Sequence, residues 1–472
     1  MKNWSGKKLL SLGYKGSKHF SNTIAHLNAI DATEAQAMAY IDALLSAMPV
    51  EILPYKEAKG YFVNLDANDD DAEAAFIAEN YEKVKQTMDE VMKTPTVLAG
   101  AVMPDACPAG GVGNIPVGGV VVTDNAIHPS MHSADICCSV YNTTFPKGIL
   151  CKDVLNAAHT VTHFGKGWRS DNIFEIVPEL QKELDVIIEK MKANVWLNDP
   201  KSIDFARKYL GTQGDGNHFL FVGTSENDGT VRMVTHHGSR GLGARLYSKG
   251  KDYAKKYTAK VSPKTNPINA WIPLDSIEGE TYWDALQIVR AWTKLNHKVI
   301  HNMTSRLLGL DASETENFWN EHNFVFKDDA GKVYHAKGAT PLDDKFVPDS
   351  KEGLRLIPLN MAQPVLVVKG KTTETNLGFA PHGAGRNMSR TAHAATKGNK
   401  SGYEIYAEET QGIDARFYSG KMDLSELPSA YKNADKVVAQ IEKYGLGTVV
   451  DKIHPYGCIM AGHQDAPRYK RK

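Results

Sequence analysis

One glycine-rich stretch organises the rest of this chain, and it reads His382-Gly-Ala-Gly-Arg-Asn-Met-Ser-Arg390. Its small residues let the backbone approach a ligand closely, and His382 supplies a nucleophilic side chain. A helix beginning at Gly385 would place Arg386 and Arg390 on one face. Arginine forks match phosphate oxygens, and helix N-termini attract anions. The stretch therefore indicates either a histidine that can be phosphorylated or nucleotidylated, or a structural turn followed by a surface helix.

The overall composition is that of an ordinary globular protein of 472 residues. The 55 lysines and arginines balance the 55 aspartates and glutamates, so the net charge gives no sign of nucleic acid, although a basic surface can exist locally. The five cysteines are too few and too irregularly placed for a disulfide framework. No stretch approaches the roughly 20 apolar residues of a membrane span. We expect a cytoplasmic protein that does not enter a membrane.

The hydrophobic pattern mixes helices and strands without a regular βαβα alternation, which favours an α+β fold. Helical patterns cover 33–48, 69–93, 177–193, 201–210, 241–257, 283–308 and 429–444. Short strand-like runs cover 97–98, 120–122, 136–141, 217–222, 231–235, 322–326, 332–335, 361–369 and 448–460. We expect residues 1–95 to form an N-terminal α/β segment packed on a core made by residues 96–472.

Five polar residues beside these strands are candidate metal ligands. His218, His236 and His322 each lie at an end of a short apolar run, and Asp135 and Cys138 are close neighbours in a turn-rich segment. Strand ends can converge at one rim of a sheet, and a thiolate with imidazoles and a carboxylate suits Zn, Fe or Mn. Taken one at a time, each histidine is more often a packed or hydrogen-bonded core residue than a ligand, and Cys138 more often a small buried one.

Several blocks taken in order resemble the RtcB family of RNA ligases. The blocks are Asp135-Ile-Cys-Cys138, Gly214-Asp-Gly-Asn-His218-Phe, His236-His-Gly-Ser-Arg-Gly-Leu-Gly, His322-Asn, Lys337-Gly-Ala-Thr and the stretch from His382 to Arg390. The resemblance runs from about Val97 to the C-terminus. It implies a single RtcB-like α+β catalytic domain over residues 96–472, with mixed β-sheets and surrounding helices.

The resemblance also implies an activity. Members of the family join an RNA 3′-phosphate or 2′,3′-cyclic phosphate to a 5′-hydroxyl, using GTP and two Mn²⁺ ions, in RNA repair or tRNA splicing. By position, His382 resembles the histidine that accepts GMP, and Cys138 the ligand that bridges the two metals. Asp135 and His218 would complete one metal site, and His236 and His322 the other.

The same resemblance assigns residues around the nucleotide. Asn217 resembles the residue that contacts the nucleotide phosphate, and Arg386 is expected to face phosphate. The turn His382, Gly383, Ala384, Gly385 and Arg386 would hold the nucleotide. The expected partners are RNA with the ends named above, a nucleotide and a helper protein.

Four positions depart from the family pattern around the base. Phe221 stands where the family usually has glutamate, Asn360 and Val365 where it has serines, and Ala461 where its tail has a lysine. We therefore expect the metal and histidine chemistry to be kept and the base pocket to be rebuilt, which leaves the base of the nucleotide open.

Two other functions fit the same residues. One is a metal-dependent RNA-end phosphatase or cyclic phosphodiesterase that keeps only the first half of the chemistry. The other is a catalytically inactive protein that binds RNA ends. Covalent attachment of a nucleotide to His382 would separate the ligase from both.

Overall fold

The structure is a computed structural model. It describes residues 4–12, 14, 20–47, 52–66, 74–347, 350, 352–388, 390, 393 and 400–463. The chain divides into two compact units, Met1–Leu53 and Pro54–Lys472, whereas the sequence analysis divided it after residue 95. Among the described residues, no helix is both long and apolar enough to cross a bilayer.

The first unit is helical and consists of α1 (Gly6–Ser11), α2 (Phe20–Ala29) and α3 (Glu34–Ala47). Thr33 begins α3 because its hydroxyl accepts from the backbone of Gln36 at 3.3 Å, while the Gln36 side chain accepts from the Thr33 backbone at 2.9 Å. The helix predicted over 33–48 is confirmed. Trp4, Leu9 and Leu27 are buried in a core that belongs to this unit alone.

The second unit is built on a mainly antiparallel β-sheet, whose order among the described residues is β1-β2-β3-β10-β9-β5-β7-β6-β16-β13-β12, with β15 paired to β16. These strands are β1 (Phe62–Val63), β2 (Val97–Cys107), β3 (Val117–Thr123), β5 (Cys138–Thr144), β6 (Phe219–Ser225), β7 (Val231–His237), β9 (Glu316–Lys327), β10 (Val333–Lys337), β12 (Arg355–Pro358), β13 (Val365–Lys369), β15 (Asp414–Phe417) and β16 (Thr448–Met460). Only the β1–β2 and β15–β16 pairs in this sheet are parallel. The strand-like runs predicted over 322–326 and 332–335 are confirmed, and they form the antiparallel hairpin β9–β10.

The remaining described strands form two small sheets. They are β4 (Ala126–Ile127) with β8 (Ile272–Pro273), and β11 (Ala339–Pro341) with β14 (Phe379–Pro381). β14 ends directly before His382, so this short sheet fixes where the glycine-rich turn begins.

Helices flank the sheet of the second unit. They are α4 (Ala74–Val91), α5 (Cys151–Val161), α6 (Gln181–Ala193), α7 (Pro200–Lys208), α8 (Arg240–Val261), α9 (Ile277–Leu307), α11 (Gly402–Glu409) and α12 (Ala434–Lys443). Short 3-10 helices are η1 (Pro129–Met131), η2 (Ile173–Glu175), η3 (Pro178–Leu180), η4 (Pro267–Asn269), η5 (Ala312–Glu314), η6 (Leu424–Glu426) and η7 (Pro428–Ala430). The predicted α+β class is confirmed.

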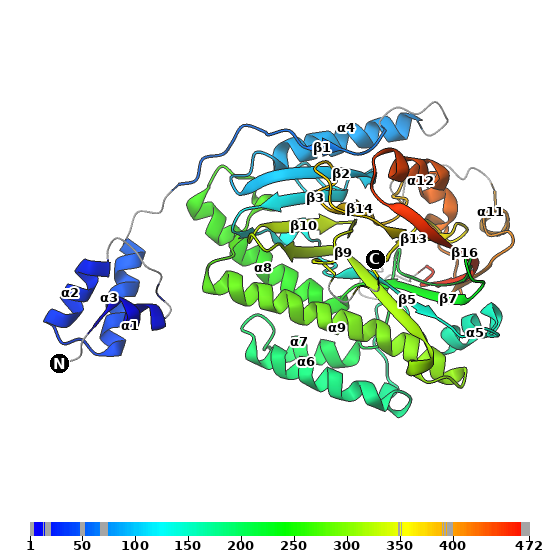
Figure 1. Cartoon of the computed structure of the whole chain (residues 1–472), viewed down its shortest axis with the longest axis horizontal. Helices are drawn as coiled ribbons and strands as arrows, with labels where there is room; N and C mark the ends of the chain where they lie inside the picture. The colour runs from blue at the N-terminus through cyan, green and yellow to red at the C-terminus, as the bar shows by residue number, and fades with distance from the viewer. Residues whose placement is uncertain are drawn as a thin grey trace, which may run out of the picture. The chain divides into compact units, whose positions relative to one another are not determined.

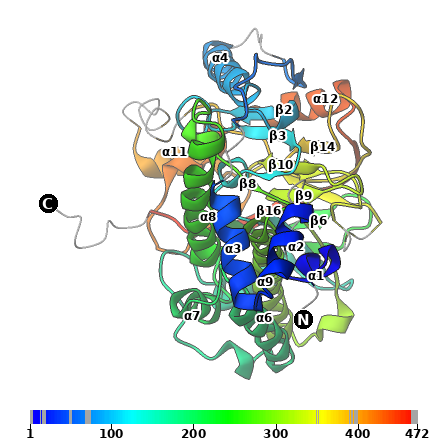
Figure 2. The ribbon, with the colours of Figure 1, turned by 90° about the vertical axis from the view of Figure 1, so that its left-hand side faces the viewer.

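The long helix α9 is the centre of the helical layer. α5, α6 and α8 pack against it, and α4 and α12 lie beside β2 at the other end of the sheet (Figures 1 and 2). α9 begins where Ser276 accepts from the backbone of Gly279 at 3.0 Å. Its Trp292 is fully buried and donates to the carbonyl of Ala206 on α7 at 2.8 Å. Each large apolar side chain buried in this way contributes about 1.5–3 kcal/mol.

No helix begins at Gly385, the position from which a helix would place Arg386 and Arg390 on one face. Gly385 has left-handed backbone, with φ of 75°, and Arg386 forms a β-bridge with Tyr431. The tight turn is required because a Cβ at position 385 would overlap the backbone of Asp105 on β2. The glycine thus lets the His382 turn lie directly on strand β2.

Candidate active site

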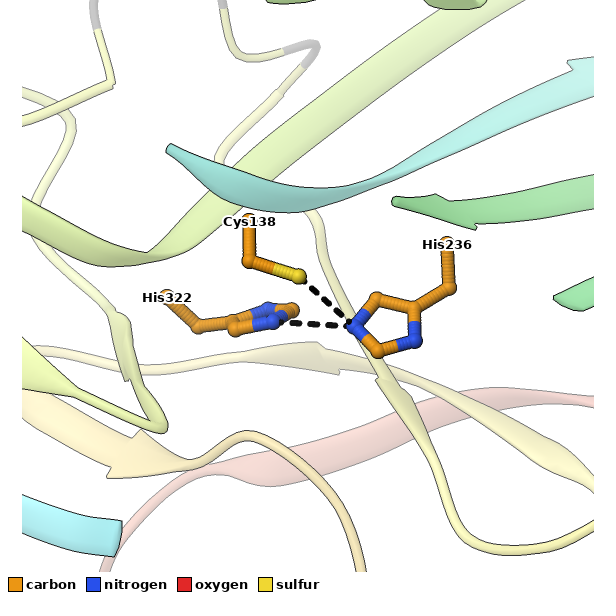
Figure 3. Close-up of side chains that lie close together, drawn as sticks. All are labelled: Cys138, His236 and His322. Carbon is orange, nitrogen blue, oxygen red and sulfur yellow. Dashed lines mark hydrogen bonds between the residues drawn. The ribbon is translucent and has the colours of Figure 1, made fainter. Parts of the chain in front are cut away.

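Three neighbouring strands bring Cys138, His236 and His322 together. Cys138 begins β5, which pairs with both β7 and β9. The Cys138 Sγ lies 3.2 Å from Nε2 of His236, and that nitrogen lies 3.1 Å from Nε2 of His322 (Figure 3). All three residues are buried. One sulfur and two imidazole nitrogens therefore converge on one point.

A β-bulge positions His322. On β5, Cys138 is opposite Asn323 and Ser139 is opposite Glu321, so His322 is the extra residue of β9. Bulges bend a strand and redirect a side chain. The prediction that His322 lies at a strand end is wrong, because β9 begins six residues earlier, at Glu316. The bulge, rather than a strand end, turns the His322 side chain towards Cys138.

A second group shares the same sulfur. Nε2 of His218, which directly precedes β6, lies 3.8 Å from the Cys138 Sγ and 3.1 Å from Oδ2 of Asp135. The ligand-type atoms within each group all lie within 4.8 Å of one another. Cys137 takes no part, since its left-handed backbone (φ 58°) leaves its side chain in the hydrophobic core.

The backbone orients the rings of two of the histidines. Nδ1 of His218 donates to the carbonyl of Gln213 at 2.6 Å, and Nδ1 of His236 donates to the carbonyl of Asn217 at 3.1 Å. Each bond leaves the Nε2 lone pair directed at Cys138, which is the arrangement seen when a histidine binds a metal.

Burial sets the protonation of these side chains. It lowers the pKa of His236 to about 3 and that of His322 well below its usual range, so both rings are neutral. Burial and the nearby Asp135 carboxylate raise the pKa of the Cys138 thiol well above its usual range. A divalent cation would reverse this effect, because metal binding deprotonates a coordinating thiol. The donor set fits borderline cations such as Mn²⁺, Fe²⁺ or Zn²⁺.

His382 is held by a buried carboxylate. Its Nδ1 donates to Oδ2 of Asp105 at 2.5 Å, and its backbone N–H donates to the same oxygen at 3.1 Å. Asp105 is fully buried on β2. With Nδ1 occupied, Nε2 carries the lone pair. The ring centroid of His382 is 4.9 Å from that of His322, so the nucleophile adjoins the Cys138–His236–His322 group.

A cavity of about 350 Å³ joins these features. Asp135, Cys138, His236, His322 and His382 line it, and so do Asn217, Gly383, Ala384, Gly385 and Arg386. His218 adjoins this wall through Asp135 and Cys138. The residues predicted to bind metal and those predicted to bind nucleotide thus meet at one place.

Comparison with known proteins shows the family of the chain. A sequence model described as tRNA-splicing ligase RtcB matches residues 158–461. The chain belongs to the RtcB family.

Similar RtcB proteins occur in archaea and bacteria. The tRNA-splicing ligase RtcB of Archaeoglobus fulgidus is 30% identical over 301 residues, which cover 54% of this chain and 60% of that protein. The one from Aeropyrum pernix is 27% identical over 437 residues, or 75% and 86% of the two chains. The RNA-splicing ligase RtcB of Mycobacterium bovis is 27% identical over 284 residues, or 53% and 64%. The match thus spans less than two thirds of the Archaeoglobus and Mycobacterium proteins.

Two acidic residues of this RtcB chain were missed from the sequence. Asp105 is separated from His382 by 277 positions, and its only signal was a carboxylate in a β-rich segment. Glu426 on η6 pairs with both Arg390 and Arg386, the latter at 3.5 Å. Arg386 lines the cavity as expected, but its guanidinium also donates to the carbonyl of Ser425 at 2.9 Å.

The far wall of the cavity in this RtcB chain is apolar. Phe221 on β6 is paired with Cys458 on β16, and Phe219 with Met460, so all four side chains lie on one face of the sheet. Val365 and Asn360 also line the cavity. Burial raises the pKa of Cys458 to about 12, which keeps its thiol uncharged. Phe221, Asn360 and Val365, which are expected to depart from the family pattern, therefore all line the cavity.

Lys337 lines the cavity close to His382. Its ammonium donates to the carbonyl of Ile115 at 3.0 Å and to Oδ1 of Asn114 at 3.3 Å. Burial lowers its pKa to about 8. A bound phosphate would favour the protonated form of this lysine.

Proposed function

We propose that this protein is a metal-dependent RNA ligase that joins RNA 3′-phosphate or 2′,3′-cyclic phosphate ends to 5′-hydroxyl ends through a nucleotide on His382. The observation that carries the proposal is the position of His382. Its ring adjoins His322, which belongs to one of two ligand groups that share Cys138, and His382 lines the same cavity as Cys138. Membership of the RtcB family supports the same reaction class.

The first step is attack by His382 on a nucleoside triphosphate. A bond forms between Nε2 and the α-phosphorus, the bond from that phosphorus to the pyrophosphate oxygen breaks, and pyrophosphate leaves. The histidine then carries positive charge, which the buried carboxylate of Asp105 stabilises through Nδ1–H. Asp105 therefore positions the ring and offsets its charge.

The later steps transfer the nucleotide. An oxygen of the RNA 3′-phosphate attacks the same phosphorus, and the His382 nitrogen leaves as neutral imidazole. The 5′-hydroxyl of the second RNA then attacks the 3′-phosphorus, loses its proton, and displaces the nucleoside monophosphate. A 2′,3′-cyclic end must first be opened by water to a 3′-phosphate.

We propose Mn²⁺ as the cation, held by Asp135, Cys138 and His218 in one group and by Cys138, His236 and His322 in the other. When bound, such ions neutralise phosphate charge and orient the reacting oxygens. Lys337 adds a cation at the same cavity. Asn217 and residues 383–386 line the space that the triphosphate would fill.

The proposal does not specify which base the nucleotide carries. GTP is the nucleotide that the family resemblance implies, but Phe221, Val365 and Cys458 offer a planar base an apolar surface instead of ionised partners. We infer that discrimination between GTP and other nucleotides is weak.

The five cysteines are all free thiols, which supports a reducing compartment such as the cytoplasm.

Intact-mass measurement tests the proposal. The protein is incubated with Mn²⁺ and each ribonucleoside triphosphate in turn, and the adduct is mapped by peptide analysis. A nucleoside monophosphate on His382, absent from His382→Ala, is expected. If the protein stays unmodified, removal of RNA phosphates would favour the phosphatase or cyclic phosphodiesterase. Binding of RNA ends without any reaction would favour the inactive RNA-end-binding protein. Labelling by GTP alone would contradict weak base discrimination.

A further inference from the structure

A surface of aromatic and cationic side chains adjoins the candidate active site. It consists of Trp168, Phe205 and Tyr209 with Lys208 and Arg240, and we call it the aromatic platform. Tyr209 stacks on Phe205 with centroids 4.8 Å apart and lies edge-on to Trp168 at 6.3 Å. The ammonium of Lys208 lies 5.5 Å from the Trp168 ring, and the Arg240 guanidinium 5.6 Å from the Tyr209 ring.

Trp168 is exposed although its loop is firmly held. The residue is 55% exposed, which is unusual for tryptophan. Next to it, Arg169 donates to the carbonyl of Gly211 at 3.2 Å and pairs with Asp171 at 2.5 Å. The backbone N–H of Gly165 donates to the carbonyl of Gly214 at 2.6 Å. An ordered, exposed indole presents a preformed stacking surface.

Arg240 connects the aromatic platform to a candidate metal ligand. Its guanidinium donates to the carbonyl of Gly165 at 2.6 Å and to the hydroxyl of Thr212 at 3.1 Å. A Cβ at Gly214 would collide with this guanidinium and would lie 2.9 Å from Nδ1 of His218. The platform therefore begins beside His218 and extends outward to Trp168.

The two cations of the aromatic platform have acidic residues nearby. Lys208 also pairs with Asp204 at 3.0 Å, and both side chains are about half exposed, so the pair is worth little in water. Arg240 donates to two uncharged oxygens, and the carboxylates of Asp215 and Asp135 act on its charge at longer range. Cations next to an exposed aromatic ring are a combination that proteins use to bind single-stranded nucleic acid.

We propose that the aromatic platform binds the unpaired nucleotides next to the RNA end that enters the active site. Bases stack on the exposed ring of Trp168, and the backbone phosphates lie near Lys208 and Arg240. Stacking tolerates any base because every base has a π-face, so this contact holds the strand without reading its sequence. The inference rests on the proposed function for the identity of the RNA end.

Fluorescence anisotropy with a labelled single-stranded RNA bearing a 3′-phosphate tests the platform. Trp168→Ala removes one stacking surface and is expected to weaken binding on the order of tenfold. Trp168→Phe keeps a ring and should bind within about twofold of the wild type, since a smaller π-face still stacks. Tyr403→Ala is the matched control, because Tyr403 is an exposed aromatic residue on α11 outside the platform.

Salt and strandedness separate stacking from charge. Lys208→Ala is expected to reduce the slope of log affinity against log salt by roughly one, and Trp168→Ala to leave that slope unchanged. A blunt RNA duplex offers no unpaired bases and should bind the wild type and Trp168→Ala equally. Equal affinity of the wild type and Trp168→Ala for the single strand would refute RNA binding by the aromatic platform. An equal loss of affinity in Trp168→Ala and Trp168→Phe would refute it as well.

The same variants distinguish this inference from the proposed function. Nucleotide transfer to His382 needs no RNA, so Trp168→Ala is expected to be labelled like the wild type while its RNA affinity falls. Absence of nucleotide labelling at His382 in the wild type would refute the proposed ligase activity. The anisotropy comparison would still decide whether the aromatic platform binds RNA.

Discussion

Cys138 supplies a sulfur atom that both groups of candidate ligands share. Replacing it should therefore affect two cations at once, whereas His322 belongs to one group only. We expect Cys138→Ala to lose both Mn²⁺ ions after dialysis and His322→Ala to lose one, as measured by elemental analysis of the protein. Retention of both ions by Cys138→Ala would refute the shared ligand.

Asp105 offers a second test at the scale of one residue. Asp105→Asn keeps the size of the side chain and removes the charge that faces Nδ1 of His382. We expect the single-turnover rate of His382 labelling to fall roughly ten- to a hundredfold, the range seen for partners that orient a reactive group. Asp185→Asn, an exposed change on α6, serves as the control, and equal rates for both variants would exclude a role for Asp105.

The turn after β14 and strand β2 form the element that carries His382. Gly385→Ala introduces a Cβ where the backbone of Asp105 lies, and adds the strain of a left-handed residue. Gly420 has a similar φ of 70° with no atom within 4 Å of such a Cβ. Gly420→Ala should cost about 1–2 kcal/mol of unfolding free energy, the strain alone.

We expect Gly385→Ala to destabilise the protein more than Gly420→Ala and to abolish His382 labelling. Denaturant unfolding and intact-mass analysis of the two variants measure the difference. Similar stability and labelling in both would show that the contact between the turn and β2 does not hold the nucleophile.

Strands and the reactive blocks could be predicted from sequence because both are local patterns. The β9–β10 hairpin and the order of residues from Asp135 to His382 needed no long-range information. The bulge at His322 could not be predicted, since it depends on the register of β9 against β5. Glu426 was missed because it meets Arg386 and Arg390 only after some 40 residues of intervening chain have folded.

At the scale of the whole molecule, the division of the chain can be tested by truncation. The cavity residues all belong to the unit Pro54–Lys472. Residues 54–95 supply β1, which pairs with β2, and α4, whose Val84, Met88 and Val91 are buried against β2 and β3. We expect a chain of residues 54–472 to be labelled at His382 and a chain of residues 96–472 to be unstable. Equal thermal stability of both chains would favour a boundary at residue 95.

Buried histidines make the stability of the whole protein depend on pH. Burial lowers the pKa of His128 to about 3, of His132 to about 4 and of His301 to about 3. Below about pH 6.5 the unfolded chain binds protons at these residues and the folded chain does not. Stability is therefore full above that pH and falls as the pH drops from about 6.5 towards 4, by about 1.4 kcal/mol per pH unit for each histidine.

Denaturant unfolding at pH 7.5 and 5.5 measures this loss. His128→Gln is expected to reduce the pH dependence by about 1 kcal/mol over that interval, and His454→Gln, at a site whose side chain is 52% exposed, serves as the surface comparison. An unchanged slope in His128→Gln would show that this histidine takes up a proton in the folded state.

The apolar wall and the Cys138–His236–His322 group of candidate ligands are carried by different strands. Phe221 and Cys458 are side chains of β6 and β16, whereas Cys138, His236 and His322 belong to β5, β7 and β9. Point substitutions at alternate positions of β6 and β16 change which molecule fits the cavity and leave the register of the other three strands untouched. Under the proposed function, a lineage can thus acquire a new nucleotide preference while the Cys138–His236–His322 group stays in place throughout.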